Sequence, residues 1–157
     1  MIYACLEEVA DPEIPVLSIF DMGIVRDVII NDETIEVVIT PTYTGCPAMD
    51  MIGTQIRMNL SSHGFPNNKV TTLLSPAWTT DWMTEEGKKK LKAFGIAPPD
   101  RRQKVGEEKL FAEAEAVQCP HCDSWHTTRI SEFGSTACKA LYKCEDCKEP
   151  FDHFKCH

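Results

Sequence analysis

The stretch IVRDVIINDETIEVVITPTYTGCPAMDMIGTQIRMNLSS, residues 24–62, shows the clearest secondary-structure pattern in the first part of this chain. Two runs rich in β-branched residues, 24–30 and 34–40, are separated only by Asn-Asp-Glu, and this pattern predicts a β-hairpin. Isoleucine and leucine then recur every four positions in residues 47–62, which predicts an amphipathic helix. We therefore expect a small sheet with a helix covering one face.

The residues around this stretch extend the same pattern. Residues 2–9 predict a short helix, residues 69–75 predict a third strand, and Thr84 is placed to cap a helix over residues 85–94. The order helix, strand, strand, helix, strand, helix is typical of a small α/β (α+β) domain, which we expect to occupy residues 1–98.

Residues 99–117 begin with a proline and are rich in charged side chains, which predicts a linker. This linker would lead to a cysteine-rich module, residues 118–157. This module contains two C-x-x-C pairs separated by 21 residues, a spacing typical of four-cysteine zinc sites. Each tight turn presents two thiolates, and a hairpin between the turns would bring all four around one ion. The expected ligands are Cys119, Cys122, Cys144 and Cys147. We expect one structural zinc per chain in a β-rich, zinc-ribbon-like module, because so small a unit gains stability from a metal.

Three other interpretations of the module stay open. Cys119 and Cys122 could form a redox-active dithiol, although such a pair normally begins a helix. Four thiolates could also hold an iron-sulfur cluster, for which Cys138 and Cys156 supply further sulfur ligands. A histidine could replace one cysteine. The histidines of the module are His121, His126, His153 and His157.

Outside this module, Cys46 lies at the junction of a predicted strand and a predicted helix. Pro47 suits the first helical position, so Cys46 lies at or beside the N-cap, where free N–H groups and the helix dipole favour a thiolate. Hydroxyl groups from Thr40, Thr42, Tyr43 and Thr44 are available in the same loop. The alternative is that Cys46 is simply a small packed residue, since free cysteines are often buried.

Composition excludes several classes of function. The formal net charge is −8, and residues 1–100 hold 14 acidic against 7 basic side chains, which argues against a nucleic-acid partner. The sequence has no secretory signal and no apolar run long enough to span a bilayer, so we expect a cytoplasmic protein whose cysteines are thiols or metal ligands. Phosphate-binding loops, a nucleophile elbow and a helical di-iron motif are all missing, so the sequence shows no catalytic constellation of its own.

Three segments carry a family resemblance: DPEIPVLSIFDMGIV, TPTYTGCPAMD and LSPAWTTDWMTEEGKKKLKAFGIAPP. They resemble the metal-sulfur cluster biosynthesis domain family, whose members assist iron-sulfur assembly. With its cysteine-rich tail, the chain is similar to the family of D subunits of bacterial phenylacetyl-CoA 1,2-epoxidase systems. This resemblance implies an accessory factor that matures metal centres in other subunits of that system, above all the flavin and [2Fe-2S] reductase, rather than an enzyme.

The resemblance also implies roles for particular residues. Cys46 would transiently hold iron, an iron-sulfur cluster or a partner's thiol, and Asp21, Thr40 and Thr44 would shape its pocket. Asp21 could equally be a turn or capping residue. Trp78 and Trp82 could face a client protein or pack in the core. A structural scaffold role and homodimerisation through the first domain remain open alternatives.

Overall fold

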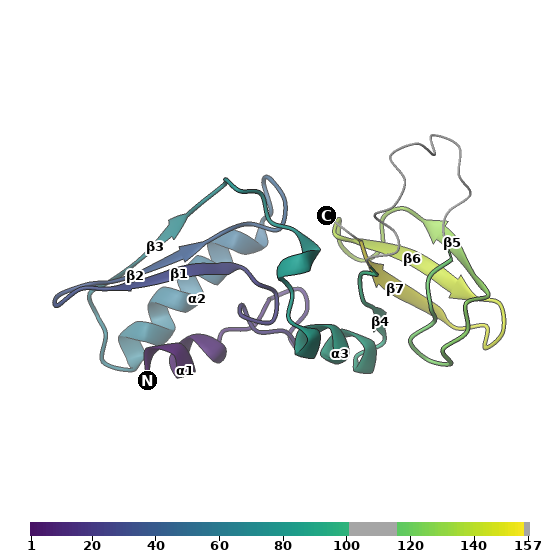
Figure 1. Ribbon diagram of the computed structural model, residues 1–157, viewed down its shortest axis with the longest axis horizontal. Coiled ribbons are helices and arrows are strands. Elements are labelled where there is room, and N and C mark those ends of the chain that lie inside the picture. The colour runs from purple at the N-terminus through teal and green to yellow at the C-terminus, as the bar shows by residue number, and fades with distance from the viewer. Residues whose placement is uncertain (101–115, 156–157) are drawn as a thin grey trace. The chain divides into compact units, whose positions relative to one another are not determined.

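The computed structural model describes residues 1–100 and 116–155 (Figure 1). Its contacts divide the chain between Gly87 and Lys88 into two compact units, and each unit is described here by itself. The mixed α and β composition agrees with the fold class expected from the sequence. None of the helices in the described residues is long and apolar enough to cross a membrane.

The first unit is a three-stranded sheet with a long helix packed on it. Strands β1 and β2 form the predicted antiparallel hairpin, and β2 pairs in parallel with β3 after the helical crossover. Each of the elements predicted here is confirmed to within a few residues. They are α1 (Ile2–Glu7), β1 (Val25–Ile30), β2 (Ile35–Ile39), α2 (Ala48–Ser62) and β3 (Asn68–Thr72). The short 3₁₀ helix η1 (Thr80–Trp82) was not predicted from the sequence.

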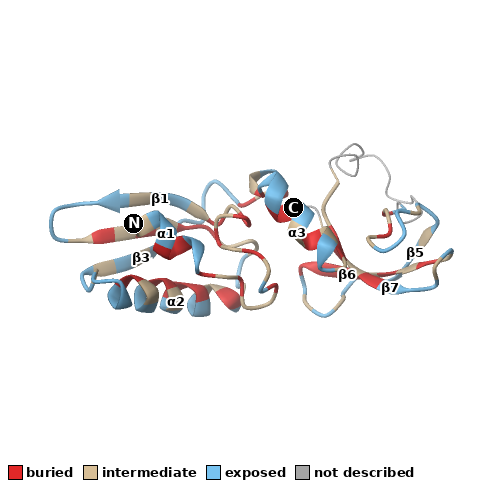
Figure 2. Ribbon diagram, turned by 90° about the horizontal axis from the view of Figure 1, so that it is seen from below, coloured by how far each residue is buried: buried red, intermediate tan, exposed pale blue. Residues whose placement is uncertain are grey.

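The core of this unit lies between β2 and α2, where both elements show their buried residues at the expected periods (Figure 2). Alternate residues of β2 are buried, and α2 buries residues spaced by four along one face. These core residues are Ile35, Val37, Ile39, Ile52, Ile56 and Leu60. The sheet therefore fixes the start of α2, and with it the loop that carries Cys46.

The second unit is built on a four-stranded sheet in the order β4-β7-β6-β5. The predicted hairpin of β5 and β6 is confirmed, and β6 also pairs antiparallel with β7. The sequence did not reveal β4 and β7, because β4 is only two residues long and β7 is a short segment that begins with a proline, which lowers the signal for a strand. The elements are α3 (Glu85–Ala93), which spans the division between the units, β4 (Ile96–Ala97), β5 (Thr127–Ser131), β6 (Lys139–Cys144) and β7 (Pro150–Phe154).

The division of the chain differs from the one drawn from sequence. The sequence suggested a first domain of residues 1–98, whereas β4 pairs in parallel with β7 and so belongs to the second sheet. No local sequence pattern predicts this pairing, because the two strands are far apart in the chain. Most of the expected linker, residues 99–117, lies outside the described residues, as does its predicted helical part.

Candidate metal centre and the Cys46 loop

The two C-x-x-C pairs lie on two turns of the same design. In the first turn the Cys119 N–H donates to Ser124 O at 2.8 Å, and in the second the Cys144 N–H donates to Glu149 O at 3.0 Å. The residue after the second cysteine of each pair has a positive φ, 61° at Asp123 and 67° at Lys148. Both turns therefore curl back to present two sulfurs from one side, although neither has the glycine that would have signalled this conformation.

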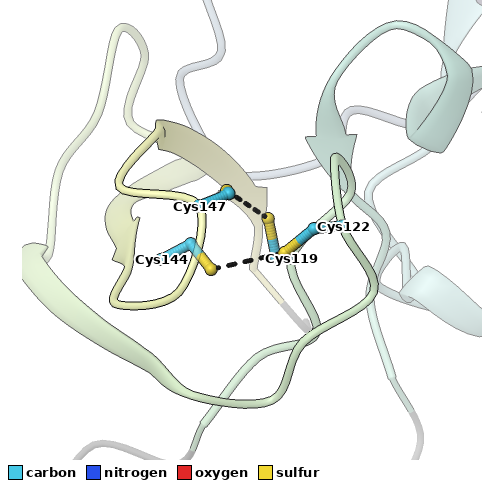
Figure 3. A group of neighbouring side chains, drawn as sticks. All are labelled: Cys119, Cys122, Cys144 and Cys147. Atoms are coloured by element: carbon cyan, nitrogen blue, oxygen red, sulfur yellow. Dashed lines mark hydrogen bonds between the residues drawn. The ribbon is translucent and has the colours of Figure 1, made fainter.

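The four sulfur atoms come together as the spacing predicted (Figure 3), and all lie within 4.8 Å of one another. The Sγ atoms of Cys119 and Cys147 are 3.8 Å apart, and those of Cys122 and Cys144 are 3.5 Å apart. A tetrahedral zinc with bonds of about 2.3 Å separates its sulfur ligands by about 3.8 Å. The arrangement therefore fits a four-thiolate metal ion without a change of fold. Within the described residues, no other group of histidine, cysteine and acidic side chains is clustered closely enough to hold a metal ion, and His157 lies outside them.

Two of these thiols, Cys144 and Cys147, have pKa values shifted in opposite directions. Burial opposes ionisation of Cys144, but backbone N–H groups of Cys147 and Asp146 outweigh it and lower the pKa of Cys144 to about 7. The Glu149 N–H favours the thiolate of Cys147, yet burial and the neighbouring sulfurs together raise its pKa to about 12. Four thiolates at this distance repel one another, so a bound cation is the natural means of holding them all ionised.

Cys46 lies in the loop that leaves the end of β2, one residue before the N-cap of α2. Pro47 is the cap residue and Ala48 begins the helix, so Cys46 is beside the cap, as expected. Its backbone N–H donates to Tyr43 O and its carbonyl accepts from the Met49 N–H, both at 3.2 Å. The side chain is half-buried, and the Thr42 hydroxyl lies 3.9 Å from its sulfur. The thiol is therefore neither sealed in the core nor fully exposed.

The other residues expected in this pocket have different environments. Thr40 is 1% exposed, and its hydroxyl has no hydrogen-bond partner within the described part of the chain. Thr44 is exposed. The carboxylate of Asp21 is buried and accepts hydrogen bonds from the Ser18 N–H at 3.0 Å and the Thr84 hydroxyl at 3.2 Å. Asp21 thus ties a turn to the start of α3, and its place in a pocket around Cys46 stays a prediction.

Comparison with known proteins matches each part of the chain to a described family. Residues 1–72 match "Iron-sulfur cluster assembly protein", and residues 103–155 match "PaaD zinc beta ribbon domain". The chain is 49% identical over 155 residues to the putative D subunit of the 1,2-phenylacetyl-CoA epoxidase of Escherichia coli (strain K12), covering 99% of this chain and 91% of that protein. The chain belongs to the PaaD family.

Two further relatives match about half of this PaaD-family chain. One is "Fe-S protein maturation auxiliary factor" of Porphyromonas gingivalis (strain ATCC BAA-308 / W83), 37% identical over 83 residues, or 52% of this chain and 78% of that protein. The other is the crystal structure of "Domain of Unknown Function DUF59 from Bacillus anthracis", with 29% identity and a TM-score of 0.54 over 57% of this chain and 87% of that chain. The iron-sulfur assembly type of domain and the zinc ribbon are therefore separate parts joined in one polypeptide.

In this PaaD-family chain the two tryptophans of the first unit are in different environments. Trp78 is 4% exposed and donates its indole N–H to Met22 O at 2.9 Å, so it packs in the core. Trp82 is half-buried, with the Arg26 guanidinium 3.6 Å from its ring centroid. The two rings therefore do not form one exposed aromatic surface.

Sequence reasoning missed the partners of Asp21. Ser18 and Asp21 bond each other reciprocally, because the Ser18 hydroxyl also accepts the Asp21 N–H at 3.1 Å. The S-x-x-D spacing of a capping box was the available signal for this pair. The contact with Thr84 spans 63 residues of sequence and had no local signal.

Proposed function

We propose that this protein is an accessory factor that matures iron-sulfur centres of a phenylacetyl-CoA epoxidase system, and that its main client is the [2Fe-2S] reductase component. The observation that carries the proposal is the joining, in one chain, of an iron-sulfur assembly type of domain to a four-cysteine ribbon with the geometry of a closed metal site. The relative covering nearly all of the chain bears the name of the D subunit of that epoxidase.

The four-cysteine ribbon would hold one structural zinc. Its four protein ligands leave no position for substrate or water, which is the usual difference between a structural and a catalytic zinc site. The chemistry of transfer would then lie in the first unit, and the ribbon would support docking of the client protein.

Cys46 would carry iron or a cluster as cargo between other proteins. Its thiol would lose a proton to solvent and bind iron as a thiolate, and a thiolate of the client would later replace it, with no change in oxidation state. Three features favour this role: the half-buried position of Cys46, the start of α2 next to it, and the hydroxyl of Thr42 near its sulfur.

The test compares wild-type protein with Cys46→Ser after anaerobic purification. Zinc, iron and sulfide contents, the absorption spectrum, and reconstitution of the metal-free reductase are measured for each. Cys5→Ala is the matched control, because Cys5 is a buried cysteine of α1 outside both sites. We expect about one zinc per chain in all three proteins, with iron uptake and reductase reconstitution lost only in Cys46→Ser.

Other results would select the competing functions. If Cys46→Ser supports the reductase as well as the wild type does, the protein is a scaffold. If iron and sulfide replace zinc in the ribbon of every variant, the zinc assignment is wrong. If metal-free protein forms a reversible disulfide between Cys119 and Cys122 and exchanges it with other thiols, the protein is a thiol oxidoreductase.

A further inference from the structure

Three side chains link the two cysteine turns outside the sulfur cluster. The Ser124 hydroxyl donates to Oδ2 of Asp146, and Nδ1 of His126 lies 3.2 Å from Oδ1 of the same carboxylate. Ser124 also accepts the His126 N–H at 3.0 Å. Ser124 closes the first turn and His126 follows it, whereas Asp146 lies within the second turn, between Cys144 and Cys147. One carboxylate therefore joins both turns with its two oxygens.

This link lies beside the more accessible ligands. Cys119 and Cys144 have no exposed surface, Cys147 is half-buried and Cys122 is exposed. Ser124 is two residues from Cys122, and Asp146 is the neighbour of Cys147. The link thus joins the parts of the turns that carry Cys122 and Cys147, the two ligands that an incoming chelator or thiol can reach first.

We propose that Asp146 is a positioning residue that sets how fast the four-cysteine site exchanges its metal. Metal exchange would begin when one sulfur is displaced, and separation of the two turns would help Cys122 or Cys147 to leave the site. The link through Asp146 opposes that movement without touching the metal, in the way that outer hydrogen bonds orient metal ligands. The inference rests on the metal site of the proposed function and is independent of the role of Cys46.

The experiment measures zinc release from the full-length, zinc-loaded protein to an excess of 4-(2-pyridylazo)resorcinol. Asp146→Ala removes both accepted hydrogen bonds, and we expect zinc release about fivefold faster than in the wild type. Glu145→Ala is the matched control, because Glu145 lies in the same turn and its carboxylate pairs instead with Lys148 at 3.7 Å. We expect this control to release zinc at the wild-type rate.

A second measurement separates positioning from ligation. The cobalt-substituted Asp146→Ala protein should keep the wild-type visible spectrum, because the four thiolates still bind the metal. Ser124→Ala removes only the hydroxyl of the link, and we expect release about twofold faster. If Asp146→Ala does not fold, zinc release from Ser124→Ala tests the inference instead.

Specific outcomes overturn the inference. If the Asp146→Ala and Ser124→Ala variants release zinc at the wild-type rate, the link does not govern exchange. A changed cobalt spectrum in Asp146→Ala would mean that Asp146 shapes the ligand set itself. If the wild-type protein binds neither zinc nor cobalt, the metal assignment fails and this inference fails with it, whereas the proposal for Cys46 is decided separately by its own variant.

Discussion

Replacing Asp21 by alanine tests whether this residue is structural or part of a reactive pocket. Its carboxylate is buried and accepts hydrogen bonds from the Ser18 N–H and the Thr84 hydroxyl. A hydrogen bond to a charged group contributes about 1.5–3 kcal/mol, and Thr84 keeps its second bond, accepted from the Gly87 N–H. We therefore expect Asp21→Ala to lower the free energy of unfolding of the first unit by about 2–4 kcal/mol.

The assay is urea unfolding of the full chain followed by tryptophan fluorescence. Trp78 and Trp82 lie in the first unit and Trp125 in the second, so a Trp125→Phe background makes the signal report the first unit. Asp21→Asn keeps one side-chain oxygen as an acceptor and should cost about 1–2 kcal/mol. Asp27→Ala is the control, because Asp27 is exposed and, within residues 1–100 and 116–155, its side chain accepts a hydrogen bond only from the adjacent Val28 N–H.

The reasoning is refuted if Asp21→Ala unfolds within about 0.5 kcal/mol of the Asp27→Ala control, the range typical of surface substitutions. If this variant is stable and yet loses iron uptake, Asp21 belongs to the Cys46 pocket. If Asp21→Asn is moderately destabilised and still takes up iron, the turn-and-cap interpretation holds.

The remaining predictions use the same unfolding assay or its pH dependence. Gly23→Ala should cost about 3 kcal/mol or more, because the added Cβ would lie 2.2 Å from the Trp82 carbonyl oxygen at a φ of +66°. Gly64→Ala, with φ +92° and nothing within 4 Å, should cost only about 1 kcal/mol, and equal losses in the two variants would contradict the steric argument. Trp78→Phe removes a buried 2.9 Å hydrogen bond to a main-chain carbonyl and should cost about 1–3 kcal/mol; no loss would mean that the carbonyl finds another donor. Burial lowers the pKa of His153 to about 4, below its unfolded value near 6.5, so its contribution is fully present above about pH 6.5 and is lost as the pH falls toward 4. Between pH 7.5 and 5.5 the wild type should therefore lose about 1 kcal/mol more than His153→Leu, measured by chemical unfolding of the second unit, and parallel losses would refute this assignment.

The local elements and the candidate ligands could be predicted because their signals are local. The hairpin of β1 and β2 follows from two β-branched runs around a polar turn, and α2 follows from a period of four in its apolar residues. The four-cysteine cluster follows from two C-x-x-C turns, since each turn presents its sulfurs from one side whatever surrounds it. Length, charge and cysteine content needed no structure at all.

Contacts between distant segments of the chain could not be predicted from local sequence patterns. The parallel pairing of β2 with β3 and of β4 with β7 joins residues that no local period relates, and it places β4 in the second sheet. The bond between Thr84 and Asp21 and the link through Asp146 likewise depend on how the chain returns to itself. Residue periodicity records the environment of one segment, whereas a hydrogen bond between remote side chains depends on the packing of the whole unit. For this reason most of the elements, the candidate metal ligands and Cys46 as the cysteine to be tested could be predicted from the sequence, whereas the sheet order, the contacts of Asp21 and the link between the cysteine turns follow from the packing of each unit.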